Sequence, residues 1–355
     1  MVKTKMKRIS ICLAGFLVAG ATVASAQTIK INAAGATFPA AIYQKWFDEY
    51  HKLHSAVQIN YQSIGSGGGI AQLTGGTVDF GASDMPMTND QLSKLKVPAF
   101  HFPTVLGAVV PTYNIPGVSA EIKFTPETLS GIFLGTIAKW NDARLAKDNA
   151  GVNLPKDDIV VVHRSDGSGT SFVWTDYLSK VSPEWKSKVG ANTSVSWPTG
   201  LGGRGNEGVA GLVKQTPNSI GYVELVWAVQ NKLTVGQVKN AAGNFVRADL
   251  ESVTDAAAGA AKDIPADFRV SITNAPGKKA FPISSFTYLL IPSTIPDANT
   301  GQAIKDFLRW MLADGQKFAA GLSYAPLPKE VVAKELKQID LVNANAKAGQ
   351  AKKTK

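Results

Sequence analysis

The chain has 355 residues, of which 45% are hydrophobic and 18% charged, with a formal net charge of +10 and one cysteine. Four of the basic residues and the cysteine fall within the first 26 residues, so the rest of the chain is only modestly basic and has no cysteine. This excludes disulfides, cysteine nucleophiles and cysteine metal sites after residue 26. The length exceeds one average domain, so we expect two lobes. No basic stripe with interleaved aromatics is present, which argues against nucleic-acid binding.

The first 26 residues have the pattern of a cleaved secretory signal peptide. Basic residues are followed by an apolar run from Ile9 to Val23 and by the small residues of the Ala24-Ser25-Ala26 cleavage site. The apolar run is too short for a membrane-spanning helix, which needs roughly 20 residues. We therefore expect residues 1–26 to be removed and the mature chain, starting near Gln27, to be exported and released.

The next part of the chain alternates between strand and helix patterns. Ile29 and Ile31 alternate with polar residues, as in a strand, and Pro39 opens a helix with aromatic residues on one face. Alternation from Val57 to Tyr61 predicts a second strand. "SIGSGGGIAQL" predicts a turn and a short helix, and "TVDFGASD" predicts a third strand. This order indicates an α/β fold with mainly parallel strands.

The middle and the end of the chain continue the pattern. Asp158 to Val162 form an apolar run that predicts a strand buried on both faces. The helix after it places Trp174 and Tyr177 on one side. Residues 220–225 predict another strand, and residues 306–322 predict an amphipathic helix.

Three strand-to-helix corners place small or hydroxyl-bearing residues just ahead of a helix. The first holds Thr37 and Phe38, the second holds Ser66 among glycines, and the third is Ser168-Gly169-Thr170. The first N–H groups of a helix have no internal partner, and the helix dipole favours negative charge there. One such corner is more often a plain helix cap. Three corners together with Arg164, whose planar fork matches an oxyanion, indicate one shared anion.

Two aspartates accompany these donors. Asp166 follows Arg164 by two residues and is expected to orient its guanidinium, with a turn-forming role before Gly167 as the alternative. Asp84 ends the third strand, where a carboxylate is favourable beside an anion only if the anion carries a proton. Phosphate has an O–H and sulfate near neutral pH has none, so Asp84 is expected to accept from phosphate and to repel sulfate. The alternative for Asp84 is a surface turn or a helix cap.

Several motifs carry a resemblance to a known family. "AGATFPAAIYQKW", "QSIGSGGGI", "TVDFGASD" and "DGSGTSFVWTDYL" resemble the periplasmic phosphate-binding protein of bacterial high-affinity phosphate ABC importers. The likeness continues through "FLGTIAKWND", "WPTGLGGRGNEG" and "IGYVE", over nearly the whole chain after the leader. It implies the two-lobed α/β fold of periplasmic binding proteins, with phosphate held in the cleft between the lobes. The residues that it implies as phosphate contacts are Thr37, Phe38 through its N–H, Ser66, Asp84, Arg164, Ser168, Gly169 and Thr170.

The resemblance also implies boundaries and partners. Lobe 1 would comprise residues 27–105 and 283–355, and lobe 2 residues 106–282, with the chain crossing between them twice. The protein is expected to be a monomer that delivers inorganic phosphate to the membrane permease of an ABC importer. It implies no catalytic residue, cofactor or metal, and no nucleic-acid partner.

These residues give weaker support to other functions. A phosphate-releasing hydrolase would use Ser168 as nucleophile, but Gly167-Ser168-Gly169 is not the G-x-S-x-G motif, and the four histidines lack metal-ligand spacing. "GLGGRG" at residues 200–205 matches a dinucleotide-binding pattern without a clear strand before it. We interpret it as a loop entering a helix near the cleft. A binder of sulfate or molybdate is the closest rival, and Asp84 argues against it.

Overall fold

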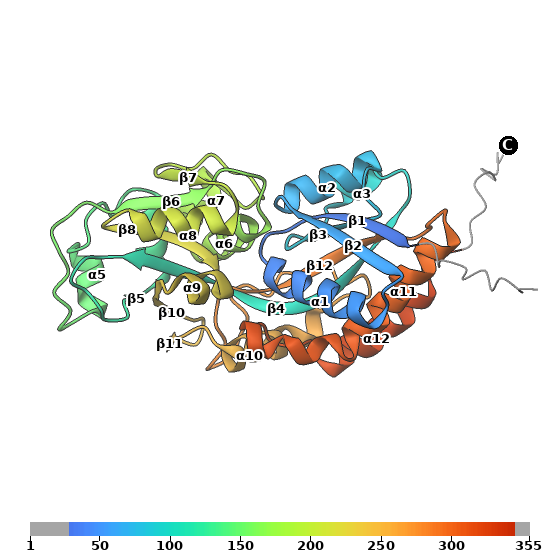
Figure 1. Cartoon of the computed structure of the whole chain (residues 1–355). Helices are drawn as coiled ribbons and strands as arrows, with labels where there is room; N and C mark the ends of the chain where they lie inside the picture. Colours follow the sequence, from blue (N-terminus) through green and yellow to red (C-terminus); the bar gives the residue numbers. More distant parts are fainter. Residues whose placement is uncertain (1–27, 345–355) are drawn as a thin grey trace, which may run out of the picture.

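The computed structural model describes residues 28–344, and the expected signal peptide lies outside these residues. Two α/β lobes lie end to end and share one long strand (Figure 1). The predicted fold class is confirmed. In the part of the chain that the structure describes, no helix is long and apolar enough to span a membrane.

The first lobe is built from both ends of the chain. Its strands are β1 (Ile29–Gly35), β2 (Val57–Ser63), β3 (Phe80–Ser83), β12 (Ser284–Pro292) and the first part of β4 (Ala99–Asn114). Its helices are α1 (Ala40–Leu53), α2 (Ser66–Gly75), α3 (Asn89–Ser93), α11 (Ala298–Leu312) and α12 (Lys329–Asp340), with the 3₁₀ turns η2 (Gly315–Phe318) and η3 (Ala320–Leu322).

The second lobe is built from the middle of the chain. Its strands are the end of β4, β5 (Lys123–Phe124), β6 (Val160–Arg164), β7 (Leu201–Gly203), β8 (Ser219–Glu224), β9 (Thr234–Val235), β10 (Gln237–Lys239) and β11 (Phe245–Val246). Its helices are α4 (Pro126–Phe133), α5 (Ala143–Asp148), α6 (Gly169–Val181), α7 (Pro183–Lys188), α8 (Gly205–Gln215) and α9 (Leu225–Asn231). The following α10 (Leu250–Ala260) and η1 (Ala261–Asp263) lie at the junction, where α10 packs against β4 and β12.

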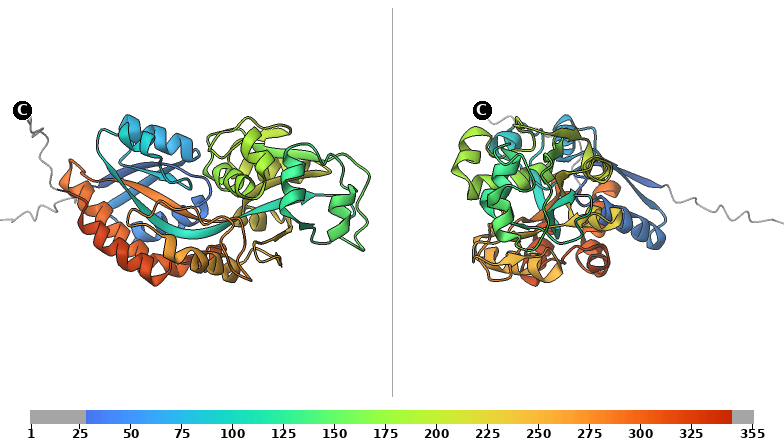
Figure 2. Two further views of the ribbon diagram at one scale, coloured as in Figure 1. Left: turned by 180° about the vertical axis from the view of Figure 1, so that it is seen from behind. Right: turned by 90° about the vertical axis from the view of Figure 1, so that its left-hand side faces the viewer.

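Strand β4 joins the lobes (Figure 2). It is antiparallel to β12 from Ala99 to Ala108 and antiparallel to β8 from Val109 to Asn114. The sheet order is β2-β1-β3-β12-β4-β8-β6-β7, and β9 also pairs with β4. Strands are parallel at both ends of the sheet, where β1 pairs with β2 and β3, and β6 pairs with β7 and β8. Ligands of such sheets bind beyond the carboxyl ends of the strands, and the three corners predicted from the sequence follow β1, β2 and β6.

Aromatic clusters hold the helices that follow two of these corners. On α1, Tyr43 packs edge-to-face against Tyr61 of β2 with ring centroids 5.4 Å apart. On α6, Trp174 stacks on Tyr222 of β8 at 5.0 Å and 13°. Stacked and edge-to-face rings contribute roughly 0.5–1.5 kcal/mol beyond the area they bury. Both helices are therefore packed against the sheet behind the loops that precede them.

The predicted helix at 306–322 has wrong bounds. Helix α11 begins earlier because Asp297 caps it, accepting from the Thr300 N–H at 2.7 Å. It ends at Leu312, ahead of the turns η2 and η3. The indole of Trp46 donates to the Gly315 carbonyl at 2.6 Å, a contact between distant segments that the local pattern does not reveal.

Candidate functional site

The three corners and Asp84 meet where the lobes touch. The Gly67 N–H at the second corner donates to the Gly167 carbonyl of the third at 2.8 Å. Ser66 Oγ accepts from the Asp84 N–H at 3.1 Å. A Cβ added to Gly169 would overlap both Ser66 Oγ and the Asp84 carboxylate. The lobes are therefore closed, and residues far apart in the sequence surround one small volume.

The first corner is anchored through its carbonyls. Trp227 of α9 donates its indole N–H to the Thr37 carbonyl at 3.1 Å, and the Tyr324 hydroxyl donates to the Phe38 carbonyl at 2.6 Å. A trans peptide points its C=O and the next N–H in opposite directions. The Phe38 N–H therefore points away from Trp227. Gly35 has a φ of 152° and packs against the Ala82 carbonyl, where a side chain would not fit.

The second corner and the third strand hold a buried carboxylate. Asp84 is 1% exposed, and it accepts from the Thr287 hydroxyl of β12 at 2.8 Å and from Ser66 Oγ at 3.4 Å. Burial raises the pKa of Asp84 to about 7, although the Thr287 bond, the Arg164 charge and the Ser66 bond oppose the shift. Asp84 is thus an acceptor that gains a proton close to neutral pH. The prediction of a surface turn as its alternative role does not fit this burial.

The third corner holds the positive charge. Arg164 directs Nε and Nη2 to the Asp166 carboxylate at 2.8 and 2.6 Å, and its side chain is only 1% exposed. Burial opposes a low pKa for Asp166, but the hydrogen bonds and charge of Arg164 lower it. Arg164 Nη1 lies 3.4 Å from Thr170 Oγ1. A guanidinium has five N–H donors, so three are used here and two are left without a partner among the described residues.

The start of α6 completes this corner. Ser168 caps the helix by accepting from the Ser171 N–H at 3.0 Å, and its hydrogen stays available to another acceptor. Gly169 and Thr170 occupy the first turn, where N–H groups have no partner within the helix. The Ser171 hydroxyl bonds the Tyr222 hydroxyl at 2.6 Å, and Tyr222 in turn accepts from the Arg164 N–H. The corner is thus tied to the aromatic core of its lobe.

Two polar residues at the site were not predicted. Thr287 lies in an apolar strand, and only the pairing of β12 with β3 brings it to Asp84. Asn206 is the second residue of α8, directly after the "GLGGRG" loop, and donates to the hydroxyls of Thr37 and Thr170. The glycine-rich loop itself reaches the site, since the Gly205 N–H donates to Asp166 at 3.0 Å. A polar residue just past that loop was the one available signal for Asn206.

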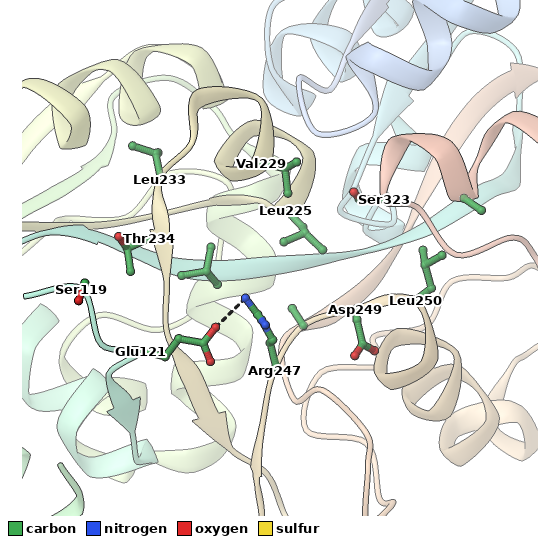
Figure 3. Close-up of a pocket in the computed structure, with 13 residues that line it drawn as sticks. Ser119, Glu121, Leu225, Val229, Leu233, Thr234, Arg247, Asp249, Leu250 and Ser323 are labelled. Atoms are coloured by element: carbon green, nitrogen blue, oxygen red, sulfur yellow. Dashed lines mark ion pairs between the residues drawn. The ribbon is translucent and has the colours of Figure 1, made fainter. Parts of the chain in front are cut away.

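A separate hollow of about 490 Å³ does not suit an anion (Figure 3). Its lining comes from α9, β9, η3 and the start of α10 and includes none of the predicted site residues. Arg247 there is already paired with Glu121 at 2.7 Å, and Asp249 adds a second carboxylate. Within residues 28–344, no group of three His, Cys, Asp or Glu side chains is placed to hold a metal ion.

The fold and the interlobe site define a two-lobed substrate-binding protein. The family model described as "PBP superfamily domain" matches residues 21–315. The fold is similar to that of a high-affinity periplasmic phosphate-binding protein, PfluDING, solved with phosphate, at 20% identity and a TM-score of 0.70 over 89% of this chain and 99% of that one. The fold is also similar to that of a phosphate ABC transporter substrate-binding protein from Clostridium perfringens, at 17% sequence identity and a TM-score of 0.62. That match covers 84% of this chain and 100% of the other chain.

Curated relatives define the family more narrowly. The phosphate-binding protein PstS of Xylella fastidiosa (strain Temecula1) is 46% identical over 307 residues, covering 86% of this chain and 84% of the relative. PstS of Pasteurella multocida is 46% identical over 315 residues, covering 88% of this chain and 90% of the relative. The chain belongs to the PstS family of phosphate-binding proteins, which confirms the predicted relationship.

Gly169 gives a direct test of closure. The Gly169→Ala variant is expected to lower ligand affinity at least tenfold, because its methyl group would collide with Ser66 and Asp84 only when the lobes close. The free energy of unfolding of the variant should stay within about 1 kcal/mol of the wild-type value, because opening the hinge relieves the collision. Gly211→Ala is the matched control, a helical glycine of α8 with open space around it. Equal affinities of the two variants, measured by calorimetry, would contradict this closed geometry.

Proposed function

We propose that this chain captures inorganic phosphate between its lobes and delivers it to an ABC-type importer. The observation that carries the proposal is the meeting of three donor-rich corners, Arg164 and a buried Asp84 around one volume. Membership of the PstS family supports phosphate as the ligand. The protein is a receptor that binds and releases its ligand unchanged, and it is not an enzyme.

The ligand contacts are proposed from this arrangement. Thr37, Ser168 and Thr170 would donate through hydroxyls, and Ser66 would do so by turning its hydrogen from Asp84 to the ligand. Phe38 and Gly169 would donate through N–H groups, and Arg164 through the two N–H groups that Asp166 and Thr170 leave free. Asp84 would accept the phosphate O–H. Micromolar affinity corresponds to about −8 kcal/mol, which several charge-assisted bonds in a closed cleft can supply after dehydration.

The lobe boundaries belong to the same proposal. Residues 27–105 with 283–355 form one lobe, and residues 106–282 form the other. Strand β4 supports this division, because it exchanges β12 for β8 between Ala108 and Val109. The returning chain crosses beside it, where the Val109 N–H donates to the Ile283 carbonyl at 2.9 Å. Opening about these two adjacent crossings would release the ligand, as in other hinged binding proteins.

The cellular setting is proposed on the same grounds. The leader-like residues 1–26 support export and cleavage, and the family supports the periplasm as the compartment. There the protein would act as a monomer and dock on the membrane permease of the phosphate importer. Closure around the ligand gives the permease a shape that differs from the open, empty form.

Calorimetry with phosphate, arsenate and sulfate at one pH tests the function. Phosphate should bind with a Kd of about 1 μM or lower. Arsenate, which is also tetrahedral and protonated, should compete with it. Sulfate should bind at least about 100-fold more weakly. Sulfate binding as tight as phosphate binding would identify a general oxyanion receptor instead.

A further inference from the structure

Asn206 has a side-chain orientation that its partners determine. It is fully buried in the first turn of α8, and its Oδ1 lies 2.9 Å from the backbone nitrogen of Glu224. A backbone N–H can only donate, so the atom facing it must be the amide oxygen. The amide nitrogen of Asn206 therefore faces the anion site, and its two hydrogens are the groups presented there.

These hydrogens reach two hydroxyls from different corners. Asn206 Nδ2 lies 2.7 Å from Thr37 Oγ1 and 3.0 Å from Thr170 Oγ1. Each hydroxyl also receives a second donor, from the Asn206 N–H at 3.3 Å for Thr37 and from Arg164 Nη1 at 3.4 Å for Thr170. A hydroxyl has two lone pairs and one hydrogen. Both lone pairs of each threonine are thus occupied, and only the hydrogen remains.

Neither hydrogen meets an acceptor among the residues that the structure describes. Among the hydrogen bonds of residues 28–344, the hydroxyls of Thr37 and Thr170 accept but do not donate. Both side chains are buried. Their hydrogens are therefore available to a ligand that offers only acceptor atoms at those positions, as the oxygens of an anion do.

We infer that Asn206 is a positioning residue that makes Thr37 and Thr170 obligatory donors to the bound anion. It fills their lone pairs, so neither hydroxyl can turn its oxygen toward the ligand or offer its hydrogen elsewhere. Thr37 and Asn206 come from different lobes of the proposed division, so the arrangement is complete only when the cleft is closed. The inference rests on the proposed phosphate function and adds to it a residue that need not touch the ligand.

The Asn206→Asp variant inverts the interaction without changing the shape of the side chain. One carboxylate oxygen can still accept from the Glu224 N–H, while the other now accepts from the two threonine hydroxyls. Those hydroxyls then donate to the new carboxylate instead of the ligand. The substitution also adds a negative charge beside the anion site. We expect phosphate affinity to fall at least about 100-fold, the equivalent of two lost hydrogen bonds at roughly tenfold each.

A double-mutant cycle separates positioning from packing. Asn206→Ala should weaken phosphate binding about tenfold in the wild-type background. It should have little further effect when Thr37→Val and Thr170→Val have removed the hydroxyls, because coupled residues are not additive. Asn240→Asp is the control, since Asn240 is also buried and satisfied but bonds carbonyls away from the site. It should lower the melting temperature and leave phosphate affinity unchanged.

The outcomes distinguish this inference from the function beneath it. If wild-type protein binds phosphate but the effects of Asn206→Ala and the two Thr→Val changes simply add, Asn206 does not act through the hydroxyls and the inference is wrong. Unaltered phosphate affinity in a folded Asn206→Asp variant would overturn it equally. If wild-type protein fails to bind phosphate in the same titrations, the proposed function and the inference both fall.

Discussion

Replacing Arg164 with alanine is expected to weaken phosphate binding by a factor of about 10² to 10⁴. The side chain is 1% exposed and keeps two N–H groups for the ligand after bonding Asp166 and Thr170. Each hydrogen bond to a charged group contributes roughly 1.5–3 kcal/mol. Loss of two such bonds, at 1.4 kcal/mol per tenfold change, gives this range.

The same change should also weaken the fold. Arg164→Ala leaves the Asp166 carboxylate, among the residues that the structure describes, with the Gly205 N–H as its donor from another residue. Breaking a buried ion pair costs about 3–5 kcal/mol. Affinity must therefore be measured by calorimetry below the melting temperature of the variant. The affinity loss and the stability loss are then two separate quantities.

Arg144 is the matched control for Arg164. It makes the same pair with an aspartate two residues away, through Nε and Nη2 to Asp142 at 2.9 and 2.8 Å, but its side chain is 52% exposed. Exposed pairs contribute about 0–1 kcal/mol, so Arg144→Ala should change neither affinity nor stability by much. A folded Arg164→Ala variant that binds phosphate as the Arg144→Ala variant does would remove Arg164 from the ligand site.

The local patterns predicted the corners because each depends on neighbouring residues. Ser168 caps α6, and Gly65 takes a φ of 89° before α2. Both features depend on a few consecutive residues, so the sequence pattern indicates them. The charge pair of Arg164 and Asp166 is also local. The helix cap, the glycine turn and the charge pair each form within a short segment, and the structure has them at the positions that the sequence indicates.

Contacts set by strand pairing were not accessible in the same way. Thr287 reaches Asp84 only because β12 pairs with β3 in one register, and Asn206 reaches Thr37 only because the lobes are closed. The single strand β4 that serves both lobes was likewise not predicted. Such partners are separated by up to 203 residues in the sequence, and no periodicity of one segment encodes them.

Asp84→Asn is expected to remove most of the discrimination between phosphate and sulfate. In the wild type, the buried carboxylate faces an unprotonated sulfate with no hydrogen between them, and an unpaired buried charge costs more than the roughly 1–3 kcal/mol of a neutral group. The amide of Asn can turn its N–H toward sulfate or its oxygen toward a phosphate O–H. Sulfate affinity should therefore rise about 100-fold, and phosphate affinity should change less than tenfold.

The pH dependence of sulfate binding tests the same role of Asp84. Because the pKa of Asp84 is about 7, lowering the pH through this value protonates the carboxyl and turns it from an acceptor into a donor. Wild-type protein should then bind sulfate more tightly as the pH falls from 8 to 6, whereas Asp84→Asn should show no such change, since its amide does not titrate. Calorimetric titration of sulfate at both pH values measures this. Strong rejection of sulfate by Asp84→Asn at pH 8 would mean that cavity shape or the neutral donors, and not the carboxylate, select the ligand.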